Sequence, residues 1–292
     1  MSDCTRRSTE VRSIRARKRW GQHFLTSVSA AQRIVELLGA TAEEMVLEIG
    51  AGTGSLTQFL LPCCRELVAV EIDPRCIEHL RERFPAEQFP QLRLVHQDVL
   101  EFDLESLARE ALERTGRKLL VVGNLPYNIS SPLLFRLFAH ARWLGRAVIM
   151  LQREVALRLV ASPGTPEYGI PTVACWAVAR ARMHFQLSPR MFSPPPAVVS
   201  AVVSLEFLED GWTGAEYEGF LAFLHAAFGQ RRKQLRNALR HWLEQHCGSW
   251  RQGEELLAHA GIPLDRRAEQ LAPHELARIY RTVTEGKPVG TR

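Results

Sequence analysis

The sequence predicts an α/β protein with an open, mostly parallel, doubly wound sheet, a terminal antiparallel hairpin and a small all-α C-terminal domain. Three observations support this. Between residues 30 and 150, short apolar runs alternate with amphipathic ones, as in successive βαβ units. A β-rich segment at 180–208 has no helical pattern between its halves. Beyond residue 214, the composition is helical to about 284.

Five runs in the first part have the composition of strands buried on both faces, because they are almost continuously apolar. They are "MVLEIG" (45–50), "LVAVEI" (67–72), "LRLV" (92–95), "LLVVG" (119–123) and "AVIML" (147–151). Two of the intervening helices have recognisable starts. Asp73 precedes Pro74 as an N-cap, and we expect Ser131 to cap a helix in the same way before Pro132.

Two later segments, "RARMHFQL" (180–187) and "VVSAVVSLEF" (198–207), are joined by a proline-rich stretch. Without a helix between them they predict an antiparallel hairpin that ends the sheet. The segment "EDGWTG" (209–214) predicts a linker. We therefore divide the chain into a basic, disordered arm at 1–17, a sheet domain at 18–208 and a helical domain at 209–292.

The composition excludes several classes of protein. The chain has 292 residues, of which 46% are hydrophobic and 24% charged, as expected of a soluble, core-forming protein. No apolar run approaches the roughly 18 residues that a membrane span needs. The six cysteines form no Cys-x-x-Cys pair and have no histidine at zinc spacing. We expect reduced thiols, no metal, a cytoplasmic location and a monomer.

The net charge of +5 is concentrated at the N-terminus. The first 20 residues hold seven arginines and lysines against Asp3 and Glu10, and seven minus two is five. This segment is either a solvated tail or an arm that pairs with phosphates. No apolar segment follows it, which excludes a secretory signal, and its acidic residues argue against a mitochondrial presequence.

A glycine-rich turn follows the first predicted strand. "LEIGAGTGSL" places Gly50, Gly52 and Gly54 where a backbone turns tightly and approaches a ligand. Glu71 closes the next strand, about twenty residues on, at the spacing at which an acid binds ribose hydroxyls. A nicotinamide dinucleotide and S-adenosylmethionine both suit this pair. The G-x-G-x-G spacing favours S-adenosylmethionine, and a merely tight turn is the remaining alternative.

Asp98, in "HQDVLEF", follows the third strand. Its carboxylate could accept a hydrogen bond from an adenine amino group. An isolated Asp at a strand end is more often a simple cap. Its position after the strand of Glu71 supports the cofactor interpretation.

The fourth strand ends in Asn124-Leu125-Pro126-Tyr127, at the edge where such sheets bind ligands. Asn and Pro also favour an ordinary β-turn. The tetrad fits a more specific chemistry, methylation of an exocyclic amino group. That nitrogen is a poor nucleophile because its lone pair is delocalised into the ring. The Asn carbonyl and a backbone carbonyl before proline can accept hydrogen bonds from its two protons and draw the nitrogen towards tetrahedral geometry.

Tyr127 would then offer a flat face to the extruded base. Such stacking is worth roughly 1–3 kcal/mol, which offsets much of the few kcal/mol that base flipping costs. The attacked nitrogen becomes cationic and loses its proton readily, so no strong base or metal is needed. The sulfonium donor is neutralised by transfer, which favours a dry, preorganised site.

Eight blocks of the chain, in order, resemble the KsgA (RsmA) family of small-subunit rRNA adenine N6,N6-dimethyltransferases, over residues 18 to about 285. The blocks are "GQHFL" (21–25), "EIGAGTGSLT" (48–57), "VEID" (70–73), "QDVL" (97–100), "GNLPYNISSPLLF" (123–135), "MLQREVALRLVA" (150–161), "FSPPPAVVSAV" (192–202) and "AFGQRRKQLRNAL" (227–239).

The resemblance implies a Rossmann-like methyltransferase domain and transfer of methyl groups from S-adenosylmethionine to N6 of two adjacent adenines, in a hairpin loop near the 3′ end of small-subunit rRNA. It places catalysis on Asn124, Leu125, Pro126 and Tyr127, with Phe192 as a second stacking ring. Many members have Asn where this chain has His23. The implied cofactor contacts are Gln22, His23, Leu25, Gly50, Glu71, Asp98 and Asn124, to which the glycine turn adds Gly52.

Basic residues are concentrated in "GQRRKQLRNALRHW" (229–242), where Arg232, Arg236 and Arg240 recur every fourth residue. We expect one helix with a basic stripe that meets an RNA backbone, although such a stripe is often only a solvated face. The predicted RNA contacts are Arg153, Arg231, Arg232, Lys233 and Arg236. An unpaired loop adenine suits the predicted chemistry.

Three other functions remain open on the sequence. A large-subunit rRNA adenine methyltransferase shares the motifs. In those enzymes, however, the residue before Pro in the tetrad is more often Ile, whereas this chain has Leu125. A non-catalytic ribosome-assembly factor would have no need of the tetrad. A nicotinamide-dependent dehydrogenase would bind NAD in the glycine turn.

Overall fold

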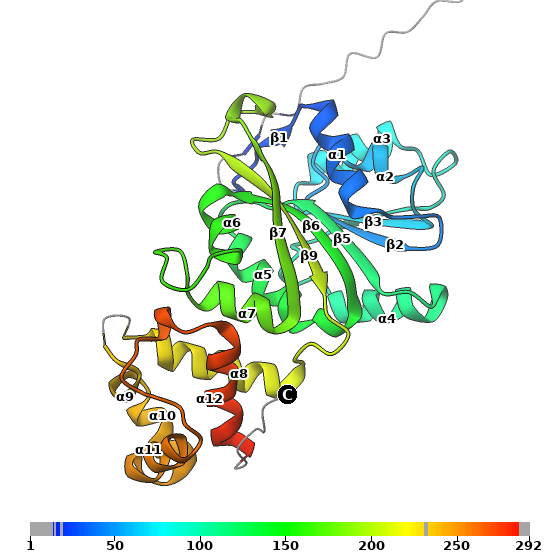
Figure 1. The fold of residues 1–292 in the computed structure, drawn as a ribbon. Helices are drawn as coiled ribbons and strands as arrows, with labels where there is room; N and C mark the ends of the chain where they lie inside the picture. The colour runs from blue at the N-terminus through cyan, green and yellow to red at the C-terminus, as the bar shows by residue number, and fades with distance from the viewer. Residues whose placement is uncertain (1–13, 15, 18–19, 231–232, 286–292) are drawn as a thin grey trace, which may run out of the picture.

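A seven-stranded mixed sheet forms the centre of the computed structural model, with helices on both faces and a helical region at the C-terminal end (Figure 1). The structure describes residues 14, 16–17, 20–230 and 233–285. The predicted arm at 1–17 therefore lies almost wholly outside the described residues. The strand order is β4-β3-β2-β5-β6-β9-β7.

All five predicted parallel strands are present, and the four contacts within this group are parallel. The predicted hairpin is confirmed as well. Its second strand, β9, lies antiparallel between β6 and β7, so β7 becomes the edge of the sheet. The strands are β2 (Met45–Ile49), β3 (Glu66–Glu71), β4 (Leu92–His96), β5 (Leu119–Asn124), β6 (Leu144–Gln152), β7 (Ala179–Leu187) and β9 (Ser200–Phe207).

Of the two helix starts that the sequence predicts, one is confirmed and one is not. Asp73 caps α3, because its Oδ1 accepts a hydrogen bond from the Arg75 amide at 3.1 Å. The cap predicted at Ser131 is wrong: α5 begins at Ser130, and Pro132 lies in its first turn, where no backbone N–H is required. The helices are α1 (Val28–Leu38), α2 (Thr57–Leu60), α3 (Pro74–Arg83), α4 (Leu104–Thr115), α5 (Ser130–Ala139), α6 (Arg153–Leu159) and α7 (Ile170–Val178), with 3-10 turns η2 (Ala141–Trp143) and η3 (Pro189–Met191).

A second, two-stranded sheet joins the N-terminal segment to the loop between β7 and β9. It consists of β1 (Phe24–Leu25) and β8 (Phe192–Ser193), which pair antiparallel. The Thr26 amide also donates to the Met191 carbonyl at 2.8 Å. This pairing brings two motifs that are about 170 residues apart in the sequence to the same end of the main sheet (Figure 1).

The C-terminal region is helical, and the predicted linker at 209–214 falls between β9 and the first of its helices. One buried apolar cluster runs from the main sheet into these helices. The Tyr168 hydroxyl adds a polar link by donating to the Leu271 carbonyl at 2.7 Å. The elements are α8 (Gly214–Phe228), α9 (Leu235–Ala238), α10 (Arg240–Cys247), α11 (Trp250–His259), η4 (Ala268–Gln270) and α12 (Pro273–Glu285).

The single helix predicted across 229–242 is wrong. Helix α8 ends at Phe228, and the chain resumes as the four-residue α9 and then α10. The reason lies in competing backbone bonds: the amides of Leu235 and Arg236 donate to the carbonyls of Arg266 and Leu264 instead of continuing a helix from α8. The predicted basic stripe is therefore divided between two short helices.

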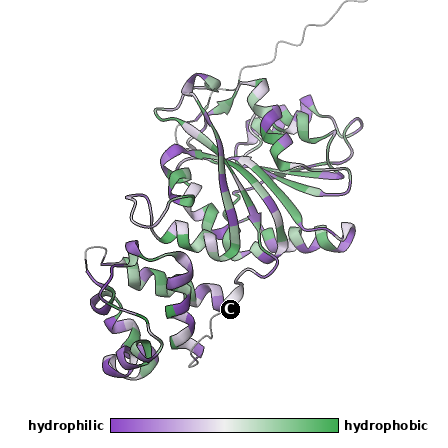
Figure 2. Cartoon of the chain, in the orientation of Figure 1, coloured by the Kyte–Doolittle hydropathy of each residue, from purple (hydrophilic) through white to green (hydrophobic). Residues whose placement is uncertain are grey.

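Apolar residues follow the strands and the inner sides of the helices (Figure 2). Among the described residues, no helix has the length and apolar character to cross a membrane. The five described cysteines are unpaired.

Gly123 marks the closest approach between two central strands. A Cβ at this position would lie 2.5 Å from the Ile49 carbonyl oxygen, which belongs to the rigid backbone of β2. The glycine of "VVGN" is therefore required by the contact between β5 and β2 and not by an unusual φ.

We predict that Gly123→Ala lowers the free energy of unfolding by about 2 kcal/mol or more, because overpacking at a backbone contact forces the strands apart. Denaturant unfolding measures the loss. Gly169→Ala is the control, since nothing lies within 4 Å of a Cβ there. Equal stability of the two variants would contradict the steric explanation.

Candidate functional site

A pocket opens at the carboxyl ends of β2, β3 and β5, where parallel α/β sheets bind ligands. The pocket is open to solvent, and its empty space, including the mouth, is about 880 Å³. Predicted site residues that line it are Gln22, His23, Gly50, Gly52, Glu71, Asp98, Asn124, Leu125 and Pro126. Apolar side chains complete the walls, among them Ile49, Val70 and Ile129.

Glu71 and the glycine turn are locked together. Gly52 has φ +54°, a conformation that favours glycine, and its amide donates to Glu71 Oε2 at 2.8 Å. The other carboxylate oxygen accepts from the Asp73 amide at 2.9 Å. Burial raises the pKa of Glu71, against the opposing effect of these backbone hydrogen bonds. Each oxygen retains a second lone pair that can accept from a ligand hydroxyl.

The N-terminal segment crosses the pocket and is tied to the next acid along the chain. The Gln22 amide nitrogen donates to Asp73 Oδ2 at 3.2 Å, and its oxygen accepts from the Arg17 amide at 2.8 Å. Asp73 is fully buried, which would raise its pKa, but hydrogen bonds from Arg75 and Gln22 outweigh burial and lower it. Gln22 therefore fixes the segment against an ionised carboxylate.

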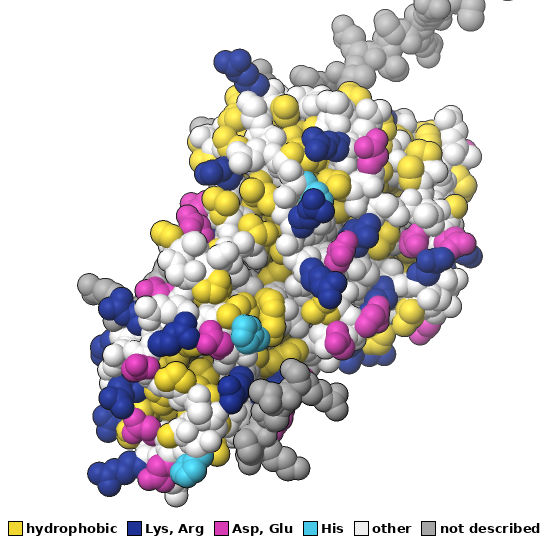
Figure 3. Space-filling model, viewed as in Figure 1, with side chains coloured by type: hydrophobic (Ala, Val, Ile, Leu, Met, Phe, Trp, Pro, Cys, Tyr) yellow, Lys and Arg dark blue, Asp and Glu magenta, His cyan; other side chains and the backbone are white. Residues whose placement is uncertain are grey.

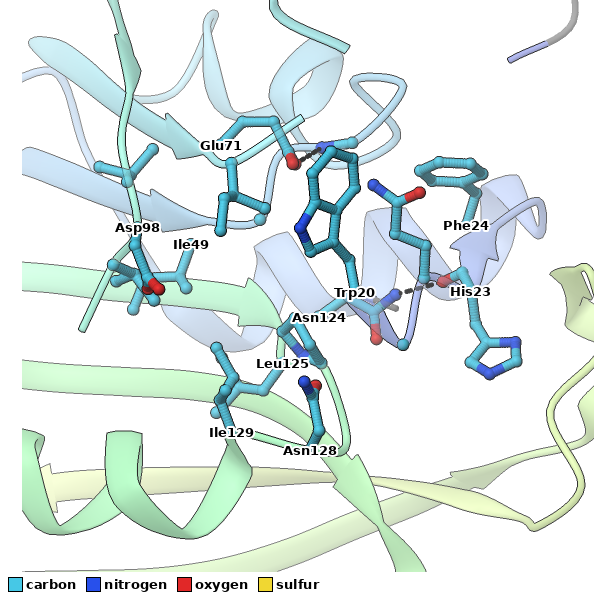
Figure 4. A pocket seen from close by; sticks show the side chains of 18 of the residues that line it. Trp20, His23, Phe24, Ile49, Glu71, Asp98, Asn124, Leu125, Asn128 and Ile129 are labelled. Carbon is cyan, nitrogen blue, oxygen red and sulfur yellow. Dashed lines mark hydrogen bonds between the residues drawn. The ribbon is translucent and has the colours of Figure 1, made fainter. Parts of the chain in front are cut away.

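Leu25 lies just behind this pocket, with its side chain 4% exposed and its carbonyl accepting from the Ser55 hydroxyl at 2.6 Å. Its predicted cofactor contact stays a prediction. Asp98 lies on the opposite wall and faces into the pocket (Figure 4). Its Oδ1 accepts from the Leu100 amide at 2.9 Å, so it caps the local turn as well.

The side chain of Asn124 has a defined orientation. Its Nδ2 donates to the His23 carbonyl at 2.7 Å (Figure 4). The amide nitrogen is thereby committed to the N-terminal segment, and the amide oxygen is directed elsewhere. The Pro126 carbonyl is also occupied, by the Ile129 amide at 3.1 Å and the Ser130 hydroxyl at 3.0 Å. The Leu125 carbonyl therefore remains the candidate for the second acceptor.

Tyr127 lies in the turn between β5 and α5 and is half-buried. The ring found next to it is that of His23, with ring centroids 5.4 Å apart and planes inclined by 30°. The His23 Nδ1 lies 2.8 Å from the Pro194 carbonyl, and its imidazole points away from the centre of the pocket (Figure 4). Phe192 is 4% exposed within the apolar cluster under α1. So little exposed area leaves its stacking role a prediction.

Trp20 is a pocket residue that the sequence analysis missed. Its indole lies between Glu71 and Asn124 (Figure 4). The position of Trp20 directly before the "GQHFL" block could have indicated a place in the pocket. A lone aromatic residue next to a basic tail, however, does not by itself predict a binding site.

The predicted RNA contacts are dispersed. Arg153 is exposed at the start of α6, and Lys233 is exposed in the C-terminal region. Arg236 forms an ion pair with Glu254 of α11 at 2.9 Å, which the local sequence did not reveal. Arg231 and Arg232 lie outside the described residues. On the face in Figure 3, basic and acidic side chains of the helical region lie close together.

Comparison with known proteins gives the family. A model of the ribosomal RNA adenine dimethylase family matches residues 13–285. The chain belongs to this family. It is 38% identical over 269 residues to ribosomal RNA small subunit methyltransferase A of Chlorobium limicola, covering 92% of this chain and 93% of that protein. The same protein from Rubrobacter xylanophilus is 40% identical over 277 residues, covering 95% and 98%.

Two solved methyltransferase structures share the fold. A dimethyladenosine transferase from Plasmodium falciparum superposes with a TM-score of 0.77 at 24% identity, over 88% of this chain and 96% of that one. The 23S rRNA methyltransferase ErmE superposes with a TM-score of 0.66 at 25% identity, over 89% and 99%. The predicted methyltransferase sheet with a helical C-terminal region is thus confirmed.

Glu48 is buried directly behind the glycine turn of this dimethylase. It is 1% exposed, and its Oε2 accepts from the Thr57 hydroxyl at 2.7 Å. Burial raises its pKa from 4.5 to about 8; the bond from Thr57 opposes the rise and the charge of Glu71 adds to it. The carboxyl group therefore stays protonated at neutral pH in the folded protein.

We predict that Glu48 makes the protein less stable as pH rises from about 4.5 to 8. In this window the unfolded chain has lost the proton that the folded chain keeps, so the free energy of unfolding falls by up to about 1.4 kcal/mol per pH unit. Glu48→Gln should remove this slope, as urea unfolding at several pH values would show. Glu113→Gln, on an exposed part of α4, is the control. A wild-type slope in Glu48→Gln would contradict the assignment.

Proposed function

We propose that this dimethylase transfers methyl groups from S-adenosylmethionine to N6 of two adjacent adenines in a hairpin loop near the 3′ end of 16S rRNA, during assembly of the small subunit. The observation that carries the proposal is the hydrogen bond from Asn124 Nδ2 to the His23 carbonyl, 2.7 Å long. It commits the donor end of the amide and leaves the acceptor end for the adenine amino group.

The reaction needs little beyond this orientation. Asn124 Oδ1 and the Leu125 carbonyl accept hydrogen bonds from the two amino N–H groups, so the nitrogen lone pair is less delocalised and can attack the methyl carbon. S-adenosylmethionine, held by Glu71 and Asp98, would supply the methyl group: its carbon would bond to the amino nitrogen as the carbon–sulfur bond broke, and the positive charge would pass from sulfur to that nitrogen. The methylated nitrogen then releases one proton to water. Tyr127 holds the flipped base by stacking on its ring.

The residues of the pocket fit S-adenosylmethionine. Glu71 presents a carboxylate for the ribose hydroxyls beside the Gly52 backbone, and Asp98, which follows the neighbouring strand β4, faces the same space. Apolar side chains such as Ile49 and Val70 suit an adenine ring between these acids. Supplied in this pocket, the cofactor provides the electrophilic methyl group next to Asn124.

We predict that Asp98→Ala weakens S-adenosylmethionine binding by roughly 10- to 100-fold, because a hydrogen bond to a charged acceptor contributes about 1.5–3 kcal/mol. Isothermal calorimetry measures the change. Glu101→Ala removes an exposed carboxylate from the same loop and should bind normally. Tighter binding of NAD than of S-adenosylmethionine would instead favour the dehydrogenase alternative.

The small-subunit substrate is supported by relatives. Those cited above from Chlorobium limicola and Rubrobacter xylanophilus are small-subunit methyltransferases and are matched over nearly their full length. One observation supports a large-subunit rRNA substrate instead: the 23S rRNA methyltransferase ErmE shares the fold at 25% identity. We infer that Arg153 and Lys233 contact the phosphate backbone, with Arg236 once its ion pair to Glu254 opens.

We predict that Asn124→Ala lowers methyl transfer to immature small subunits by about 100-fold or more, the loss typical of removing one preorganised hydrogen-bonding group at a reacting centre. Incorporation of labelled methyl groups measures the rate, and primer extension identifies the modified nucleotides. RNA affinity should be retained. Undiminished transfer would refute the role of Asn124, and modification of large-subunit RNA would refute the substrate.

A further inference from the structure

The hydroxyl group of Tyr127 has a partner that the proposed stacking does not require. Its Oη lies 2.6 Å from Oγ of Ser200, 73 residues further along the chain. A phenylalanine ring would present the same aromatic face to a base. The hydrogen bond therefore calls for an explanation other than stacking itself.

Ser200 is held by the main sheet. It is the first residue of β9, a strand with neighbours on both sides, and it pairs with Gln152 of β6 and Leu187 of β7. The residue is almost completely buried, with 1% of its surface exposed. The position of the Ser200 hydroxyl is thus set by the main sheet and not by a loop.

Tyr127, by contrast, lies in the turn between β5 and α5 and is only half-buried. Two side-chain torsions determine where its ring points, and the aromatic ring next to it is the tilted imidazole of His23. A ring that has to be ordered when the base arrives loses part of its stacking energy to side-chain entropy. A hydrogen bond to a rigid strand removes that loss in advance.

We propose that Ser200 is a positioning residue, whose hydroxyl fixes the ring of Tyr127 in the orientation that receives the flipped adenine. The proposal rests on the stacking role proposed for Tyr127. Ser200 acts through Tyr127 and does not touch the base or the cofactor; neither residue lines the cofactor pocket. Its loss should therefore affect the RNA substrate and leave the binding of S-adenosylmethionine unchanged.

A double-mutant cycle tests the proposal. Ser200→Ala and Tyr127→Phe should each lower kcat/KM for immature small subunits about three- to tenfold, the range expected for one hydrogen bond. The double variant should be no worse than either single variant, because both remove the same interaction. Losses that multiply, or a wild-type rate in Ser200→Ala, would overturn the proposal.

A matched control separates positioning from stability. Ser204→Ala removes another buried hydroxyl from β9, one bonded to His184 Nε2 at 2.8 Å, and should methylate RNA at the wild-type rate. An RNA hairpin with 2-aminopurine at the target position provides a second readout. Its fluorescence should be quenched by stacking in the wild type and less so in Ser200→Ala. Equal quenching would count against the proposal.

Tyr127→Ala distinguishes this proposal from the one on which it rests. If Tyr127→Ala retains full activity, the stacking role itself fails. If Tyr127→Ala is inactive while Tyr127→Phe and Ser200→Ala are both normal, stacking stands and only the positioning role of Ser200 is refuted.

Discussion

The hydrogen bond between the Asn124 amide and the His23 carbonyl is the interaction on which the rest of the site depends. An amide has a donor end and an acceptor end, and methylation of an amino group requires the acceptor end to face the substrate. The carbonyl that accepts from the donor end of this amide belongs to a segment 101 residues earlier in the sequence. That segment is itself fixed, because Gln22 binds the buried carboxylate of Asp73 and Leu25 pairs with Phe192.

The main sheet provides a rigid frame for these contacts. Glu71 and Asn124 end two parallel strands on either side of β2, so both residues lie at one edge of the sheet and line the same pocket without long loops. The close approach of Gly123 to Ile49 sets the height at which Asn124 leaves the sheet. The antiparallel pair β7 and β9 then contributes from the other side, where Ser200 meets Tyr127.

Much of this arrangement was predictable because it depends on local sequence. Buried parallel strands have a distinctive composition, and a glycine turn followed by an acid marks a nucleoside site in such a sheet. The features that were missed depend on partners distant in sequence. The helix expected at 229–242 is interrupted by backbone bonds to Leu264 and Arg266, and Arg236 pairs with Glu254. Likewise, no local pattern indicates that Trp20 lies between Glu71 and Asn124 or that Ser200 bonds to Tyr127.

The small sheet of β1 and β8 has a practical consequence. It joins the N-terminal segment that lines the pocket to the proline-rich loop between β7 and β9 through a single pair of two-residue strands. An affinity tag or fusion partner joined immediately ahead of residue 20 would lie a few residues from this two-stranded sheet. A tag attached after α12 would be remote from it in the sequence. Tags and fusion partners are therefore best attached at the C-terminal end of this enzyme.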